Sequence, residues 1–408
     1  MPSQFFGLNI GMNALSAFQA AISTTANNIA NVQTEGYSRQ TTTLQASAAL
    51  RVYAKYGSTG TGVEATEIKQ ERDLYYDTKY WENQSSIGYF EQKLYYLNQV
   101  ENIFADDGVQ EGFSTIFNRV FNSLDTLNGG NAHDESVRNQ FIHDAQSLCT
   151  YFNSVAGALT ELQKDCNEEI LNATKQINII AEKISLLNKE INRLELDGGY
   201  ANELRDKRAL LVDELSAMVN VETKEYEVAN SYGENLGGTN YLVMINGQIL
   251  VDGGEYRTLQ CESSDYKRHQ TDAEGMYTIV WSDTGGDFAA TTESASGSLK
   301  ALFDLRDGNN ADNLKGTAED LVKDENGEYT TLTITGLSNN NINALNIPAE
   351  GRLKVSNTYV VYDSWEAKLD EDGNITEITF SFKEPLNALV AEKSSGCTVE
   401  IGKSVDAM

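Results

Sequence analysis

The first 34 residues of this chain contain no aspartate, glutamate, lysine or arginine. The chain of 408 residues is also poor in proline, and no proline lies between Pro2 and Pro348 to interrupt a helix. No run of about 18 apolar residues occurs, which excludes an ordinary membrane-spanning helix. The N-terminus lacks the cationic start and short apolar block of a secretory signal peptide, so export would need another signal.

The charge and the cysteines exclude further classes of function. A net charge of −29 leaves no basic stripe to neutralise phosphates, which argues against nucleic-acid binding. Cys149 and Cys166 lie on one predicted helix about 25 Å apart, too far for a disulfide. There is no CxxC spacing and no cysteine–histidine cluster, so we predict no zinc site. We expect the cysteines to be small apolar core residues: Cys149, Cys166, Cys261 and Cys397.

Weaker metal and catalytic motifs are better explained by structure. Asp370, Asp372 and Asn374 resemble part of a calcium loop, but Gly373 precedes the third ligand and the closing glutamate is missing. We therefore assign a polar hairpin turn. The histidines have no regular metal spacing and are assigned surface or capping roles: His133, His143 and His269. Neither GxSxG nor a glycine-rich phosphate loop occurs, so we predict no catalytic residue, no metal, no cofactor and no enzymatic activity.

The uncharged N-terminal segment carries a row of apolar residues at every seventh position: Leu8, Leu15, Ile22 and Ile29. A second row three positions further on contains Phe18 and Val32, with Gly11 and Thr25 as its small members. This spacing predicts a helix with a coiled-coil seam. One interpretation is an ordinary buried helix of a globular bundle. We favour a helix ordered by assembly, because a solvated helix normally keeps one charged face and because serine, threonine, asparagine and glycine are mediocre helix formers.

Periodicity predicts an α+β multidomain fold, in which long antiparallel helices form a helical-bundle rod and β-rich domains follow. The longest periodic segment, residues 134–196, predicts a helix roughly 95 Å long with a stutter near Cys166. Asn246-Gly247 between apolar runs predicts a hairpin. We expect six segments: an assembly helix at 1–40, an extended linker at 41–70, a helical bundle at 71–221, a β-rich domain at 222–296, a helical re-entry segment at 297–312 and a β-rich insertion at 313–408.

The end of the first segment resembles a known family. Residues 28–31, Asn-Ile-Ala-Asn, followed by Thr34, Gly36 and Tyr37, resemble the N-terminal signature of bacterial flagellar axial proteins of the rod, hook and hook-associated class. The continuation Ser-Arg-Gln at 38–40 is most similar to the hook-associated members. Residues 202–215 resemble the end of their central helical domain, although Ala209 replaces a commonly acidic residue. Residues 297–308 resemble the point where the chain re-enters that domain.

The resemblance implies a fold. In the family, N- and C-terminal helices pair in the inner layer of a tube, a helical domain surrounds that layer, and β domains face outward. It also implies export through the flagellar type III apparatus and a chaperone that binds the C-terminal helix. No long heptad segment follows residue 308. We therefore expect a C-terminally truncated sequence without the partner helix or the chaperone site.

The implied function is structural: a secreted subunit that polymerises into a ring or short tube joining hook to filament. Its implied partners are further copies of itself, hook protein, a second junction protein and the export apparatus. Two alternatives stay open, another axial protein (rod, hook or flagellin-like second junction protein) and a secreted coiled-coil adhesin. The predicted interface consists of apolar seam residues, asparagines expected to bond between helices, and the turn that leaves the inner layer: Leu8, Leu15, Phe18, Ile22, Asn27, Asn28, Ile29, Asn31, Gly36 and Tyr37.

Overall fold

A computed structural model describes most of the chain. The described residues are 5–51, 57–106, 111–131, 133–196, 199–229, 235–264, 272–290, 292, 295–307, 313–323, 329–338, 340, 347, 349–355, 358–370, 373–386 and 398–403. The chain divides into two compact units. The first unit comprises residues 1–89, 173–260 and 281–298, and the second comprises residues 90–172, 261–280 and 299–408. Each is described by itself.

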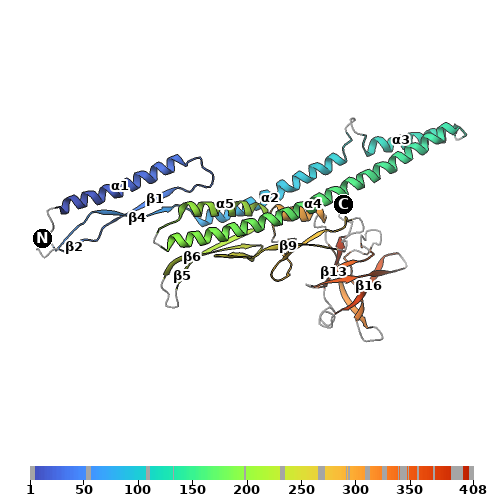
Figure 1. The fold of residues 1–408 in the computed structure, drawn as a ribbon. Coiled ribbons are helices and arrows are strands. Elements are labelled where there is room, and N and C mark those ends of the chain that lie inside the picture. The colour runs from blue at the N-terminus through green and yellow to red at the C-terminus, as the bar shows by residue number, and fades with distance from the viewer. Residues whose placement is uncertain are drawn as a thin grey trace. The chain divides into compact units, whose positions relative to one another are not determined.

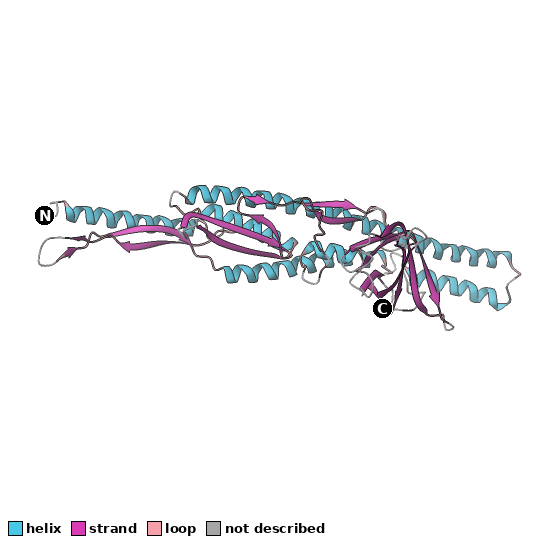
Figure 2. Cartoon of the chain, turned by 90° about the horizontal axis from the view of Figure 1, so that it is seen from below, coloured by secondary structure: helices cyan, strands magenta, loops and turns pink. Residues whose placement is uncertain are grey.

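The N-terminal part of the first unit consists of one helix and one hairpin. Helix α1 (Phe6–Ala30) contacts strands β1 (Gln40–Ala46) and β4 (Val63–Gln70), which pair antiparallel. The short strands β2 (Leu50–Arg51) and β3 (Ser58–Thr59) pair beyond them. Both views show the hairpin running alongside α1 (Figures 1 and 2). The segment expected to be an extended linker is thus a hairpin packed on the first helix.

The helices follow the predicted periodicity closely. They are α2 (Leu74–Ile103), α3 (Phe113–Thr126), α4 (Glu135–Glu195), α5 (Asn202–Met218) and α6 (Ser298–Arg306). Helix α4 is one uninterrupted element of 61 residues, as the alternating spacing predicts. A π-helical turn, η1 (Leu127–Asn131), continues from α3.

The core of the first unit lies between α4, α5 and a four-stranded sheet. That sheet has the order β5 (Val221–Ala229), β6 (Asn235–Ile245), β7 (Gln248–Asp252) and β8 (Glu255–Tyr256). Asn246 and Gly247 both have positive φ, which confirms the predicted two-residue hairpin turn between β6 and β7. Fully buried aliphatic side chains fill the centre: Ile177, Ile180, Ile184, Ile191, Val212, Leu215, Val243 and Ile245.

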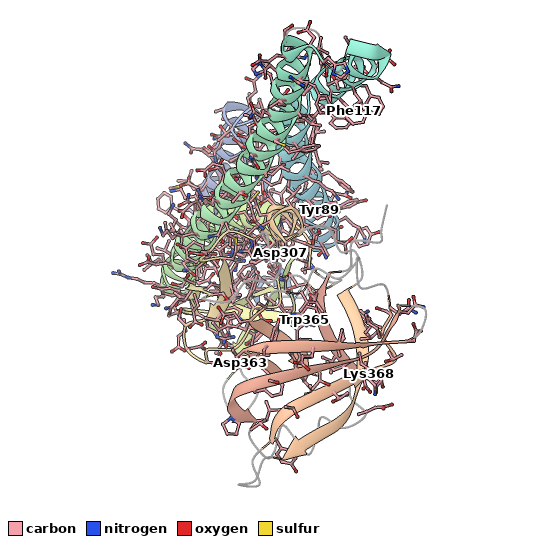
Figure 3. The ribbon with its side chains drawn as sticks, turned by 90° about the vertical axis from the view of Figure 1, so that its right-hand side faces the viewer. Tyr89, Phe117, Asp307, Asp363, Trp365 and Lys368 are labelled. Carbon is pink, nitrogen blue, oxygen red and sulfur yellow. The ribbon has the colours of Figure 1, made fainter. Side chains whose placement is uncertain are left out.

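The second unit contains a seven-stranded antiparallel sheet built from residues 313–403. Its strand order is β14 (Thr358–Tyr362), β13 (Gly351–Val355), β17 (Thr398–Lys403), β11 (Asn313–Lys323), β12 (Tyr329–Thr335), β16 (Ile375–Leu386) and β15 (Ser364–Leu369). Trp365 and Lys368 mark β15 in Figure 3, and Phe117 marks α3. Leu332, Ile334, Ile378 and Phe380 are fully buried on its core face. Strands β9 (Leu259–Ser263) and β10 (Tyr277–Trp281) form a separate pair.

Several smaller predictions can be compared with the structure. Cys166 is buried as expected, but Cys149 is exposed on α4 and Cys261 is only half-buried, so the core assignment is wrong for Cys149. Asp370 closes the predicted polar turn, because its backbone N–H donates to the Asn374 carbonyl and its carboxylate accepts the Asn374 N–H. Three residues named in the sequence analysis lie outside the described residues: His269, Asp372 and Cys397.

Candidate assembly interface

The apolar seam of α1 is exposed. Leu15 is 68% exposed, and Ile22 and Ile29 are each 70% exposed, while Leu8 and Phe18 also face solvent. Covering a side chain of this size stabilises by about 2 kcal/mol, so the five together offer roughly 10 kcal/mol before the entropic cost of association. The structure therefore leaves uncovered the row that the sequence singled out. Its role in assembly stays a prediction.

The opposite face of α1 is covered by the chain's own hairpin. Ala17 and Thr24 are buried there. The Thr42 hydroxyl on β1 donates to the Thr24 hydroxyl at 2.9 Å. Small side chains at this seven-residue spacing, about two helical turns, let a strand approach the helix closely. This face of α1 is therefore covered by the chain itself rather than by an assembly partner.

The three predicted asparagines bond within the chain rather than between helices. The Asn28 amide bonds the Gln40 backbone as a residue of a neighbouring strand would. Its Oδ1 accepts the Gln40 N–H at 2.9 Å, and its Nδ2 donates to the Gln40 carbonyl at 2.8 Å. The Tyr37 hydroxyl also donates to Asn28 Oδ1, at 2.8 Å. Asn27 Nδ2 donates to the Tyr37 hydroxyl at 3.3 Å, and Asn31 Nδ2 donates to Asn27 Oδ1 at 2.8 Å. These bonds hold the end of α1 to the start of β1.

Gly36 and Tyr37 form the turn that leaves the helix. Gly36 has φ +73°, and a Cβ there would lie 2.3 Å from Leu210 Cγ on α5, so only glycine fits. Burial, and then the carboxylates of Asp206 and Glu203, raise the pKa of the Tyr37 hydroxyl. Tyr37 therefore stays a protonated donor toward Asn28 at neutral pH. The sequence correctly marked this pair as a turn, and the structure adds Leu210 as the side chain that covers it.

Sequence reasoning missed a recurring device, in which side-chain amides on helices bond the backbone of strands and loops. Asn178 both accepts the Leu259 N–H and donates to the Leu259 carbonyl, each at 2.8 Å. Asn188 Nδ2 donates to the Gly253 carbonyl at 2.7 Å. Asn167 accepts the Tyr277 N–H at 2.8 Å. A signal was available in the sequence, because these amides lie among the apolar residues on the inward face of α4, where each buried amide needs a partner.

The described residues contain neither a metal site nor a membrane-spanning helix. No group of three or more His, Cys, Asp or Glu side chains there is arranged to hold a metal ion. None of the helices described is both long enough and apolar enough to span a bilayer.

Comparisons with known proteins agree with the N-terminal pattern and extend beyond it. The family model described as "Flagellar hook-associated protein FlgK helical domain" matches residues 97–327. The model described as "Flagella basal body rod protein" matches residues 8–37, which contain the exposed seam. A solved structure, the flagellar hook junction protein FlgK from Burkholderia pseudomallei, is 17% identical with a TM-score of 0.48 and covers 81% of this chain and 63% of its own.

Named relatives share sequence over a similar span. Flagellar hook-associated protein 1 of Bacillus subtilis is 34% identical over 257 residues, which is 62% of this chain and 48% of the relative. The Salmonella typhimurium protein of the same name is 33% identical over 255 residues, or 62% of this chain and 43% of the relative. The chain thus spans about half the length of these relatives.

The two family matches define the class, which is that of the flagellar rod and hook-associated proteins. Within that class the family is specific, because the helical-domain model covers more than half of the chain. The chain belongs to the flagellar hook-associated protein FlgK family.

Proposed function

We propose that this chain is a secreted structural subunit at the junction between hook and filament, and that it polymerises through α1. The observation that carries the proposal is the conjunction of two findings. The family match covers residues 97–327, and the exposed heptad row lies within the rod-protein match at 8–37. A helix with an uncovered seam and no charge is suited to burial among other helices.

The names of the relatives support hook association as the partner class. Within the proposal, further copies of this chain cover the seam of α1 and hook protein adjoins the resulting ring or tube. A second junction protein and the type III export apparatus are partners implied by the resemblance. Another axial protein is the second candidate, favoured by the rod-protein match, but the match at 97–327 supports a hook-associated member.

The test places a carboxylate in the seam. Ile22→Asp in the full chain should abolish incorporation at the junction, because each copy would bury an unpaired charge. Ser23→Asp is the matched control, since Ser23 is an exposed neighbour outside the seam. Incorporation would be scored by electron microscopy and motility in cells lacking their own copy. Normal incorporation of Ile22→Asp would refute assembly through the seam.

A second measurement checks that the variant is folded. Circular dichroism should give Ile22→Asp the same melting temperature as the unaltered chain, because Ile22 contributes little buried area in the free protein. A lowered melting temperature would mean that the seam supports the fold of the single chain, contrary to the proposal.

A further inference from the structure

Helix α5 has one face that is firmly fixed to the core of the first unit. Arg205 forms a two-pronged ion pair with Glu195 at 2.7 and 2.8 Å and a second with Glu225 at 2.9 and 3.0 Å. Arg208 donates to Asn188 at 3.0 Å and stacks on Tyr241, with 3.6 Å between guanidinium and ring centre. These buried, multiply bonded groups leave α5 little freedom to rotate.

The other face of α5 carries a row at four-residue spacing: Asn202, Asp206 and Leu210, here called the α5 latch. Asn202 Oδ1 accepts the Gln70 N–H at 3.0 Å, and its Nδ2 donates to the Ile68 carbonyl at 2.8 Å. Both partners lie at the end of β4. A side-chain amide thus pairs with the strand as a neighbouring strand would.

The remaining latch residues hold the loop after α1. Asp206 Oδ2 accepts the Ser38 N–H at 3.2 Å. Leu210 lies over Gly36, where a Cβ would come within 2.3 Å of Leu210 Cγ. The three side chains therefore contact the last residues of β4 and the first residues after α1, which are 34 positions apart in sequence between Gly36 and Gln70.

This placement matters because of how the chain is connected. Helix α1 and its hairpin, residues 5–70, join the rest of the first unit covalently only through the short link from β4 to α2, residues 70–74. A body attached by one short link can swing about it unless a second contact fixes its direction. The α5 latch supplies contacts at both the link and the loop, and these two points together define an orientation.

We infer that the α5 latch positions the α1–hairpin body, and thereby sets the direction in which each subunit presents its seam. Asn202 and Asp206 are the positioning residues, and Gly36 is the position that admits Leu210. The inference rests on the proposed role of α1 in assembly, but the latch itself can be tested on the isolated full chain.

The experiment is hydrogen exchange by mass spectrometry on the double variant Asn202→Ala/Asp206→Ala. Peptides covering Ser38 and Gln70 should exchange about tenfold faster, because each amide loses its acceptor. Peptides from the core of α4 should be unchanged, since alanine favours helix and the arginine face is untouched. Lys207→Ala, at an exposed residue of the same turn, is the control and should alter neither.

Single substitutions separate positioning from general stability. Asp206→Asn keeps an acceptor oxygen and should restore protection at Ser38. Asn202→Asp keeps the acceptor for Gln70 but loses the donor to Ile68. It should protect Gln70 while loosening the pairing at Ile68.

Two results would overturn the inference: unchanged exchange at residues 38 and 70 in the double variant, or equal loss of protection throughout α4 and α5. Failure of the Ile22→Asp test instead would refute assembly through the seam and leave the latch standing.

Discussion

Two rows of apolar residues in the first unit share a seven-residue spacing but differ in their exposure to solvent. Leu15, Ile22 and Ile29 on α1 are largely exposed, whereas Ile177, Ile184 and Ile191 on α4 are at most 1% exposed. The spacing therefore indicates that a face needs a cover and does not say which molecule provides it. The charge on the remaining faces distinguishes the two, because α4 carries lysine and glutamate outside its seam and α1 carries none.

The largest expected difference between the two rows is the effect of an introduced carboxylate on the free energy of unfolding. Ile184→Asp should destabilise the first unit by more than about 4 kcal/mol, because it buries an unpaired charge in a packed core. Ile22→Asp should change the free energy of unfolding by no more than about 0.5 kcal/mol. Urea unfolding followed by circular dichroism measures both. Similar losses in the two variants would mean that the α1 row is already covered within the chain.

A smaller difference in unfolding free energy is expected between the asparagines of the two helices. Asn188→Ala should cost about 2 to 3 kcal/mol, since it removes the acceptor of the buried Arg208 Nη1 and the donor to the Gly253 carbonyl. Asn28→Ala should cost about 1 kcal/mol, because it removes the partner of neutral groups only, the buried Gln40 backbone and the half-buried Tyr37 hydroxyl, whereas the groups bonded to Asn188 include a buried guanidinium. The same unfolding experiment ranks them. An Asn28 cost above that of Asn188 would contradict the burial argument.

The smallest expected effect is on pH dependence, and it belongs to α5 rather than α1. Burial raises the pKa values of Asp206 and Asp213, so their ionised forms cost stability at neutral pH and protonation on acidification removes that cost. Although burial opposes it, hydrogen bonds from Arg205 and the Ala201 N–H lower the pKa of Glu195. The stability from Glu195 is present above its ordinary pKa, about 4.5, and is lost as pH falls through the lower folded value.

Stability should therefore rise as pH falls through the raised folded pKa values of Asp206 and Asp213, and the contribution of Glu195 should be lost as pH falls below about 4.5. Unfolding in urea at a series of pH values measures this curve. Asp213→Asn should flatten the rise, because asparagine does not titrate. It should leave the fold intact, because the Trp81 indole that donates to Asp213 at 2.7 Å keeps an acceptor. If the rise in stability persists in the double variant Asp206→Asn/Asp213→Asn, other titrating groups cause it. Residues 5–34 contain no acidic or basic side chain, so α1 adds nothing to the curve.

Much of the fold follows from periodicity and turn chemistry. Helix α4 ends within one residue of the predicted bounds, and Asn246-Gly247 forms the predicted turn. The seam was predictable because apolar residues at fixed spacing have a direct geometric meaning. The packing of the hairpin on α1 was not predictable, because Ala17 and Thr24 are too small and too mildly polar to distinguish a buried face from a solvated one.

The amide contacts were beyond sequence reasoning for a different reason. The identity of an asparagine such as Asn202 does not indicate which group it bonds. Its hydrogen bonds run to backbone groups more than 130 positions away in sequence. Backbone partners have no side-chain identity, so no residue pattern marks them. The resemblance of residues 202–215 to the family located the α5 segment without showing that its side chains contact β4 and the loop after α1.

The uncharged stretch at residues 1–34 also places the apolar seam of α1 apart from the charged part of the chain. The whole net charge of −29 is carried outside residues 1–34. Free copies should therefore repel one another through the rest of the chain, and α1 lies outside that repulsion. Salt screens the repulsion over about 10 Å at 0.1 M and leaves apolar contact intact. If the chain assembles through α1 as proposed, added salt should therefore favour polymerisation, and a dilute, low-salt pool of subunits should stay monomeric.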